Sequence, residues 1–204
     1  MLANLSALEA LDRLRAGNVR FVSNVISIDS LARQLDRRAL NKTQAPVAIV
    51  LGCSDSRAPA ELVFDQGLGE LFVIRVAGNV VSPSQVGSVE FAAERYGIRL
   101  VVVMGHTQCG AIEATMEAVE QGAPPVSDNI MSIVERVRPA VEAARLAGGD
   151  REAVARAATR INVQMAVQHL RHGTPAIERL VTRDGLMVMG AEYDLESGRV
   201  DFIG

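Results

Sequence analysis

A chain of 204 residues is long enough to bury the core of one domain without disulfides or other cross-links. Apolar residues make up 49% of it and charged residues 22%, a balance that excludes a largely disordered chain. The net charge of -3 offers no basic field for a phosphate backbone or an anionic membrane, so we expect no nucleic acid and no membrane as partners. The start resembles no secretory signal, and every apolar run is shorter than a membrane span, so we expect a cytoplasmic protein.

Residues 1–43 are predicted to form a helical arm at the start of a single domain that spans residues 1–204. Ser6 and Glu9 match a capping-box pattern, and the leucines that follow indicate a helix as far as about Gly17. A second helical stretch is expected from about Val25 to Lys42. Since the arm holds too few apolar groups for a core of its own, we expect it to wrap a partner subunit.

The rest of the chain alternates short apolar runs with helical patterns. The runs lack polar alternation, which is typical of strands covered on both faces in a mainly parallel sheet. The predicted strands are Val47–Leu51, Leu71–Ile74, Leu100–Met104, Leu186–Tyr193 and Arg199–Ile203. The predicted helices are Val86–Tyr96, Ala111–Gln121, an apolar pattern from Ile130 to Val141, and Arg151–Leu170. We therefore expect an α/β fold: a mainly parallel central β-sheet flanked by helices, ending in an antiparallel edge strand after a turn around Ser197 and Gly198.

Two polar clusters directly follow the first and third predicted strands. Cys53, Asp55 and Arg57 follow one strand, and His106 and Cys109 follow the other. In open α/β sheets, ligands bind beyond the carboxyl ends of the strands. Cysteine and histidine are suitable zinc ligands, and three protein ligands leave the fourth position for water or substrate. Taken alone, Cys53 is more typical of a small buried apolar residue than of a metal ligand. When the two clusters are considered together, a metal site and buried apolar residues are equally good interpretations.

The spacing of these clusters resembles the signature of the β-class carbonic anhydrases. The first half is Cys53-Ser54-Asp55-Ser56-Arg57, and the second is Gly105-His106-x-x-Cys109-Gly110. Further segments resemble the family's connecting sequences, namely residues 64–67, 75–79, 87–91 and 190–194. The resemblance covers nearly the whole chain, from about Leu8 to the end.

This resemblance implies the reversible hydration of carbon dioxide to bicarbonate and a proton by a zinc-bound hydroxide. One Zn²⁺ per chain would be held by Cys53, His106 and Cys109. Asp55 and Arg57 match the family's catalytic pair, with Asp55 as a fourth zinc ligand in a closed form only. The positions that match the family's substrate-binding residues are Gln44, Phe72, Ala77, Phe91 and Gly110. In the family, the glutamine and part of the apolar wall come from the neighbouring subunit, so a homodimer is the expected minimal unit, with a tetramer or a larger assembly also open.

Two alternatives stay open beside this interpretation. Hydrolases of carbonyl sulfide or carbon disulfide resemble the family in fold and zinc ligands, and differ in access to the site. A structural or redox-sensing zinc protein would instead use Asp55 as a permanent fourth ligand, which Arg57 argues against. The non-catalytic bicarbonate pocket of some members uses a tryptophan where this chain has Val50, together with an arginine and a tyrosine that match Arg75 and Tyr193. We therefore do not expect bicarbonate inhibition through that pocket.

Overall fold

The structure, a computed structural model, describes residues 5–35, 44–122 and 127–203. Its helices are α1 (Ala7–Val22), α2 (Ile28–Leu35), α3 (Ala60–Val63), α4 (Pro83–Tyr96), α5 (Gly110–Gln121), α6 (Asp128–Ala147), α7 (Arg151–His172) and α8 (Pro175–Arg183). Its strands are β1 (Ala48–Gly52), β2 (Leu71–Arg75), β3 (Leu100–His106), β4 (Met187–Tyr193) and β5 (Val200–Ile203). A short 3-10 turn, η2 (Ala77–Asn79), follows β2.

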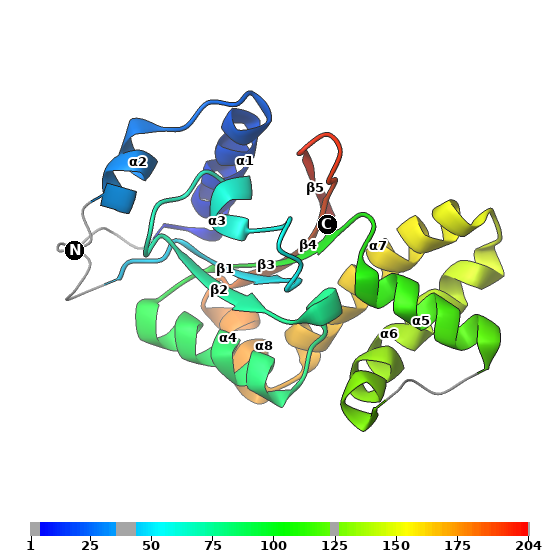
Figure 1. The fold of residues 1–204 in the computed structure, drawn as a ribbon. Coiled ribbons are helices and arrows are strands. Elements are labelled where there is room, and N and C mark those ends of the chain that lie inside the picture. The colour runs from blue at the N-terminus through cyan, green and yellow to red at the C-terminus, as the bar shows by residue number, and fades with distance from the viewer. Residues whose placement is uncertain (1–4, 36–43, 123–126, 204) are drawn as a thin grey trace.

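The strands form one five-stranded sheet in the order β2-β1-β3-β4-β5. Strands β2, β1, β3 and β4 are parallel, and β5 pairs antiparallel with β4 at one edge (Figure 1). Strands β1 and β3 are fully buried, as their unbroken apolar runs predict. The predicted α/β class and the antiparallel C-terminal edge strand are confirmed.

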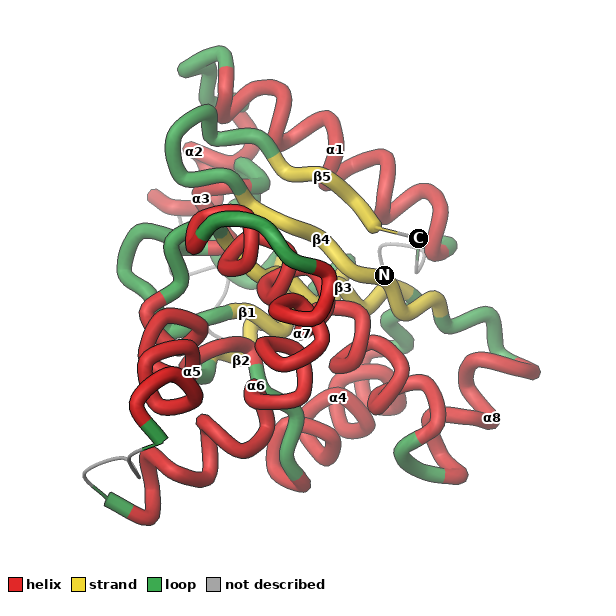
Figure 2. The backbone as a smooth tube through the Cα atoms, turned by 90° about the vertical axis from the view of Figure 1, so that its right-hand side faces the viewer, coloured by secondary structure: helices red, strands yellow, loops and turns green. Residues whose placement is uncertain are grey.

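Helices cover both faces of this sheet, as Figures 1 and 2 show. Helices α1 and α3 pack on one face, where Leu14 and Phe64 are fully buried. Helices α4, α7 and α8 pack on the other, around Val89 and Leu170. A third apolar cluster joins α5, α6 and α7 at the carboxyl ends of the strands, and it includes both cysteines. The metal-site candidates therefore lie where the sheet meets this helical layer.

Helix α1 begins with the predicted capping box, in which Ser6 and Glu9 bond reciprocally. The prediction that it ends near Gly17 is wrong, because the helix continues to Val22. At Gly17 the helix runs against a backbone carbonyl: a Cβ there would lie only 1.8 Å from the oxygen of Phe64. Gly17 therefore allows α1 to pack closely against this carbonyl and does not end the helix.

The arm packs partly on its own chain, since Leu14 of α1 is buried in the core of one sheet face. Contact of the arm with a partner subunit stays a prediction. The second predicted helix is present as α2, and its continuation to Lys42 falls outside the described residues.

Two helices were not predicted, α3 and α8. Helix α8 carries recognisable signals, because the Thr174 side chain accepts a hydrogen bond from the N–H of Ile177 and Pro175 occupies the first turn. Helix α3 is a single turn of four residues, too short for a periodic pattern. Among the described residues, no helix combines the length and apolarity that crossing a membrane requires.

Candidate metal centre

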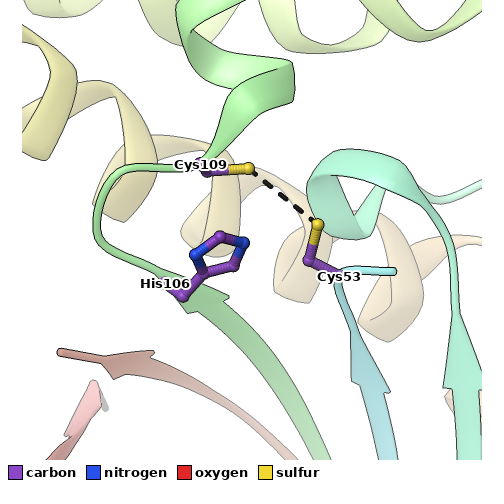
Figure 3. A group of neighbouring side chains, drawn as sticks. All are labelled: Cys53, His106 and Cys109. Atoms are coloured by element: carbon purple, nitrogen blue, oxygen red, sulfur yellow. Dashed lines mark hydrogen bonds between the residues drawn. The ribbon is translucent and has the colours of Figure 1, made fainter. Parts of the chain in front are cut away.

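Three side chains meet at the carboxyl ends of two neighbouring strands. Cys53 directly follows β1, His106 is the last residue of β3, and Cys109 is the N-cap of α5. Because β1 and β3 pair in parallel, with Gly52 opposite Met104, these ends lie side by side. The two Sγ atoms are 4.0 Å apart, and the imidazole of His106 lies beside them (Figure 3).

The geometry of these three residues fits a zinc ion. Their potential ligand atoms all lie within 4.8 Å of one another. Tetrahedral zinc with Zn–S bonds of about 2.3 Å separates two sulfur ligands by about 3.8 Å, close to the separation observed here. The Nε2 atom of His106 is buried and has no hydrogen-bond partner among the described residues. A buried imidazole nitrogen left unpaired beside two thiols is explained by a metal ligand role.

His106 is held by its other ring nitrogen. Nδ1 lies 2.8 Å from the carbonyl oxygen of Thr107, so Nδ1 carries the proton and donates it to that carbonyl. The lone pair of Nε2 is thereby directed toward the cysteines. Thr107 is in turn fixed, because its Oγ1 accepts a hydrogen bond from the N–H of Leu195 at 3.0 Å. Such an outer hydrogen bond is usual for histidines that bind metal, and the sequence alone does not identify Thr107 as its acceptor.

The two thiols perturb each other. The pKa of Cys53 lies well below its usual range because Cys109 hydrogen-bonds to its sulfur, and the N–H of Gly78 adds a second donor at 3.4 Å. The pKa of Cys109 is correspondingly raised, by its hydrogen bond with Cys53 and by burial. The arrangement thus favours the thiolate form of Cys53, which is the form that binds a metal cation.

Asp55 and Arg57 form a bidentate pair beside the cluster. Arg57 donates from Nε to one carboxylate oxygen of Asp55 at 3.0 Å and from Nη2 to the other at 2.8 Å. The guanidinium holds the pKa of Asp55 far below its usual range. Oδ2 of Asp55 lies 3.9 Å from Nε2 of His106, close to the ligand atoms while bound to Arg57. Asp55 is therefore ionised and turned toward Arg57, not toward the ligand cluster.

Arg75 fixes the loop that carries Cys53 and Asp55. Its Nε donates to the carbonyl oxygen of Cys53 at 2.9 Å, and its Nη2 donates to that of Asp55 at 2.5 Å. The strand register explains the reach, because Arg75 ends β2 opposite Gly52 of β1. The sequence connected Arg75 only with a bicarbonate pocket. Tyr193, the other residue of that pocket, is buried with its ring beside Phe21.

The predicted substrate-binding residues fall into two groups. Ala77 belongs to η2, next to the glycine that bonds Cys53, and Gly110 follows Cys109 at the start of α5. Gln44, Phe72 and Phe91 instead gather around Tyr96. Nε2 of Gln44 lies 2.6 Å from the hydroxyl of Tyr96, and both phenyl rings have their centroids about 6 Å from its ring. None of the contacts described for this second group involves a cysteine ligand of the same chain.

We call the four residues Gln44, Phe72, Phe91 and Tyr96 the aromatic cluster. Phe72 lies on β2, which is an edge strand, Phe91 and Tyr96 lie on α4, and Gln44 precedes β1. Phe91 is 54% exposed. Sequence reasoning did not include Tyr96. The sequence feature that could have indicated Tyr96 is its position in the same predicted helix as Phe91, five residues further along.

Comparison with known proteins identifies the family of this chain. The family model of carbonic anhydrase matches residues 48–200. A carbonic anhydrase of Mycolicibacterium smegmatis is 38% identical over 199 residues, covering 97% of this chain and 94% of the relative. The β-carbonic anhydrase CafA of Aspergillus fumigatus has the same fold, with a TM-score of 0.75 at 24% identity over 92% of this chain and 88% of that one. A tetrameric β-carbonic anhydrase of Sordaria macrospora gives a TM-score of 0.74 at 20% identity, over 96% and 98% of the two chains. With a matched family model, a close relative over nearly its full length and the fold of the β class, this chain belongs to the carbonic anhydrase family.

Proposed function

We propose that the chain binds one zinc ion at Cys53, His106 and Cys109 and hydrates carbon dioxide reversibly to bicarbonate and a proton. The observation that carries the proposal is the buried, unpaired Nε2 of His106 beside two sulfur atoms 4.0 Å apart. Zinc, when bound, acts as a Lewis acid that lowers the pKa of water and so provides a hydroxide nucleophile near neutral pH. Three protein ligands leave room for that chemistry.

The position and negative charge of Asp55 suit a hydrogen-bond acceptor that orients the attacking oxygen. As a carboxylate it accepts a hydrogen bond from the attacking oxygen and directs a lone pair of that oxygen toward the carbon of carbon dioxide. Arg57 keeps Asp55 in this role, because two parallel N–H donors engage both carboxylate oxygens while Oδ2 stays 3.9 Å from Nε2 of His106. A closed form, in which Asp55 takes the fourth ligand position, requires this pair to separate. Since Arg57 also donates to the carbonyl of Gln108 at 3.2 Å, the pair is tied to the loop between His106 and Cys109.

The apolar wall that contacts carbon dioxide is proposed to be formed by residues of two chains. In this proposal Ala77, next to the Gly78 that bonds Cys53, would supply a small apolar surface, and the N–H of Gly110, which follows Cys109, would donate to a substrate oxygen. The aromatic cluster would cover the cysteines of a second copy, and the exposure of Phe91 on α4 supports this arrangement. A homodimer is then the minimal active unit. The tetrameric relative from Sordaria macrospora supports oligomer formation in this fold.

The metal assignment is tested on the purified chain. Elemental analysis should give one zinc per chain, and stopped-flow assays should show carbon dioxide hydration that is lost on chelation. Cys53→Ser and Cys109→Ser should each abolish tight zinc binding. Arg136→Ala, a substitution at an exposed residue on α6, is the control and should retain zinc. Full zinc retention in both serine variants would falsify the site, and faster turnover of carbonyl sulfide than of carbon dioxide would change the assigned substrate.

Sharing of the site between chains is tested by complementation. One chain carries Cys53→Ser, and the other carries Gln44→Ala with Phe91→Ala, so that each homodimer has two defective sites. A mixed dimer, isolated with two different tags, has one complete site if the aromatic cluster serves the partner. Its activity should then approach half that of the parent. An inactive mixed dimer would place Gln44 and Phe91 in the site of their own chain and would contradict the proposal.

We further propose a cytoplasmic location. Cys53 and Cys109 are free thiols in the structure, and a reducing compartment keeps them available as ligands.

A further inference from the structure

The turn η2 covers Cys53 and holds an unusual backbone conformation. Gly78 has φ +65° and Asn79 has φ 44°, so two consecutive residues lie in the left-handed region. In this conformation the N–H of Gly78 points at Sγ of Cys53, at a distance of 3.4 Å. The turn is also tightly packed, because a Cβ on Gly78 would lie 3.0 Å from the Cβ of Ala111 in α5. A backbone in this region needs neighbours that hold it there.

A side chain from another part of the chain provides that support. Nδ2 of Asn162, in α7, donates to the carbonyl oxygen of Gly78 at 2.8 Å, across 84 residues of sequence. Asn162 is buried, with 5% of its surface exposed, so this bond does not compete with bulk water. The bond fixes the peptide unit on one side of Gly78, while the unit on the other side carries the N–H that faces Cys53.

The neighbouring residue sets the position of Asn162. Val163 lies over two glycines of adjacent strands: a Cβ on Gly105 would come within 2.7 Å of its Cγ2, and a Cβ on Gly190 within 2.6 Å of its Cγ1. Helix α7 therefore packs closer to β3 and β4 than larger residues there would allow. This close approach places the carboxamide of Asn162 within reach of η2.

We propose that Asn162 is a positioning residue that acts through Gly78 on the metal ligand Cys53, an inference that rests on the proposed zinc site. By holding the carbonyl of Gly78, the carboxamide keeps the N–H of the same residue aimed at the thiolate. An N–H donor withdraws electron density from sulfur and stabilises its negative charge. Without the carboxamide, η2 loses the contact that fixes its left-handed backbone, the donor turns away, and the sulfur becomes a more electron-rich and less firmly placed ligand.

The test uses Asn162→Leu and a matched control, Asn18→Leu. Asn18 is equally buried, at 6% exposed, and its side chain donates to the carbonyl oxygens of Val63 and Gly198. The control therefore removes buried amide hydrogen bonds at α1, without touching η2. Two readouts that do not depend on turnover are measured on both variants and the parent. These are the energy of the thiolate-to-metal charge-transfer band after cobalt(II) substitution, and zinc affinity by competition with a chromogenic chelator.

In Asn162→Leu we expect the charge-transfer band to move to lower energy and zinc to bind about 10-fold more weakly, as is typical when an outer contact of a metal ligand is lost. In Asn18→Leu both should equal the parent values. If Asn162→Leu does not fold, Asn162→Asp gives the same comparison, because a carboxylate of the same size cannot donate to the carbonyl of Gly78 when ionised.

Two outcomes would overturn the inference in different ways. A folded Asn162 variant with the parent's cobalt spectrum and zinc affinity would show that the carboxamide only stabilises the fold. A parent that binds neither cobalt nor zinc would remove the proposed metal site itself, and this result is visible before any variant is compared.

Discussion

Replacing Gly105 by alanine should destabilise the protein mainly through one steric contact, with Val163. The new Cβ would lie 2.7 Å from Cγ2 of Val163 and 3.2 Å from Cγ2 of Thr159, whereas carbon atoms in contact prefer about 3.5–4.0 Å. Val163 cannot turn aside, because a β-branched residue in a helix has one strongly preferred rotamer and its other methyl lies over Gly190. The helix or the strand must therefore move by about 1 Å.

Overpacking of this kind costs about 1–3 kcal/mol. For a chain of this size that corresponds to a fall in Tm of about 2–12 °C. Val163→Ala on its own removes two methyl groups from a fully buried site and should cost about 2–3 kcal/mol. The two changes act on the same contact, so the double variant should be at least about 1 kcal/mol more stable than the sum of the single effects predicts.

The assay is urea denaturation of the four proteins at one fixed protein concentration, since association between copies shifts apparent stability. Zinc content is measured alongside, because His106 directly follows Gly105. We expect zinc binding to weaken in Gly105→Ala and to recover in part in the double variant. Additivity within about 0.5 kcal/mol would refute the reasoning, because it would mean that a side chain on Gly105 does not meet Val163.

Three further predictions concern groups away from the metal ligands. Burial raises the pKa of Glu192, although Arg160 pairs with it at 2.7 Å, so ionisation of this carboxyl group opposes folding. Glu192→Gln should therefore become more stable relative to the parent as the pH rises above about 4, and a stability difference that does not change with pH in urea titrations would contradict this. Arg20→Ala removes the cation beside the buried carboxylate of Asp65 and should cost about 2 kcal/mol by the same denaturation assay, with no loss of zinc. Ser6→Ala removes the N-cap of α1 and should cost about 1 kcal/mol, which Ser6→Thr should largely restore.

That Cys53, His106 and Cys109 lie together was predictable, because each is next to a strong local signal. Cys53 and His106 come at the ends of two apolar runs, and the parallel pairing of those strands needs no further information to bring their ends together. The pair of Asp55 and Arg57 could also be predicted from the sequence, since a single residue separates them and the bidentate contact is local. Gln44 and Phe91 could be assigned a role only by resemblance, because their contacts in this chain lie around Tyr96 and not at the cysteines.

The sequence by itself determined the fold class, most helices and strands, and the edge of the sheet at which the site lies. Apolar periodicity and capping patterns act within a few residues, so they can be recognised without knowing what packs against them. Only the tertiary structure decided that α1 continues through Gly17, that Thr107 orients His106, and that Asn162 reaches the turn over Cys53. These features depend on the distance between one backbone and another, and such distances are set by packing between elements far apart in the chain.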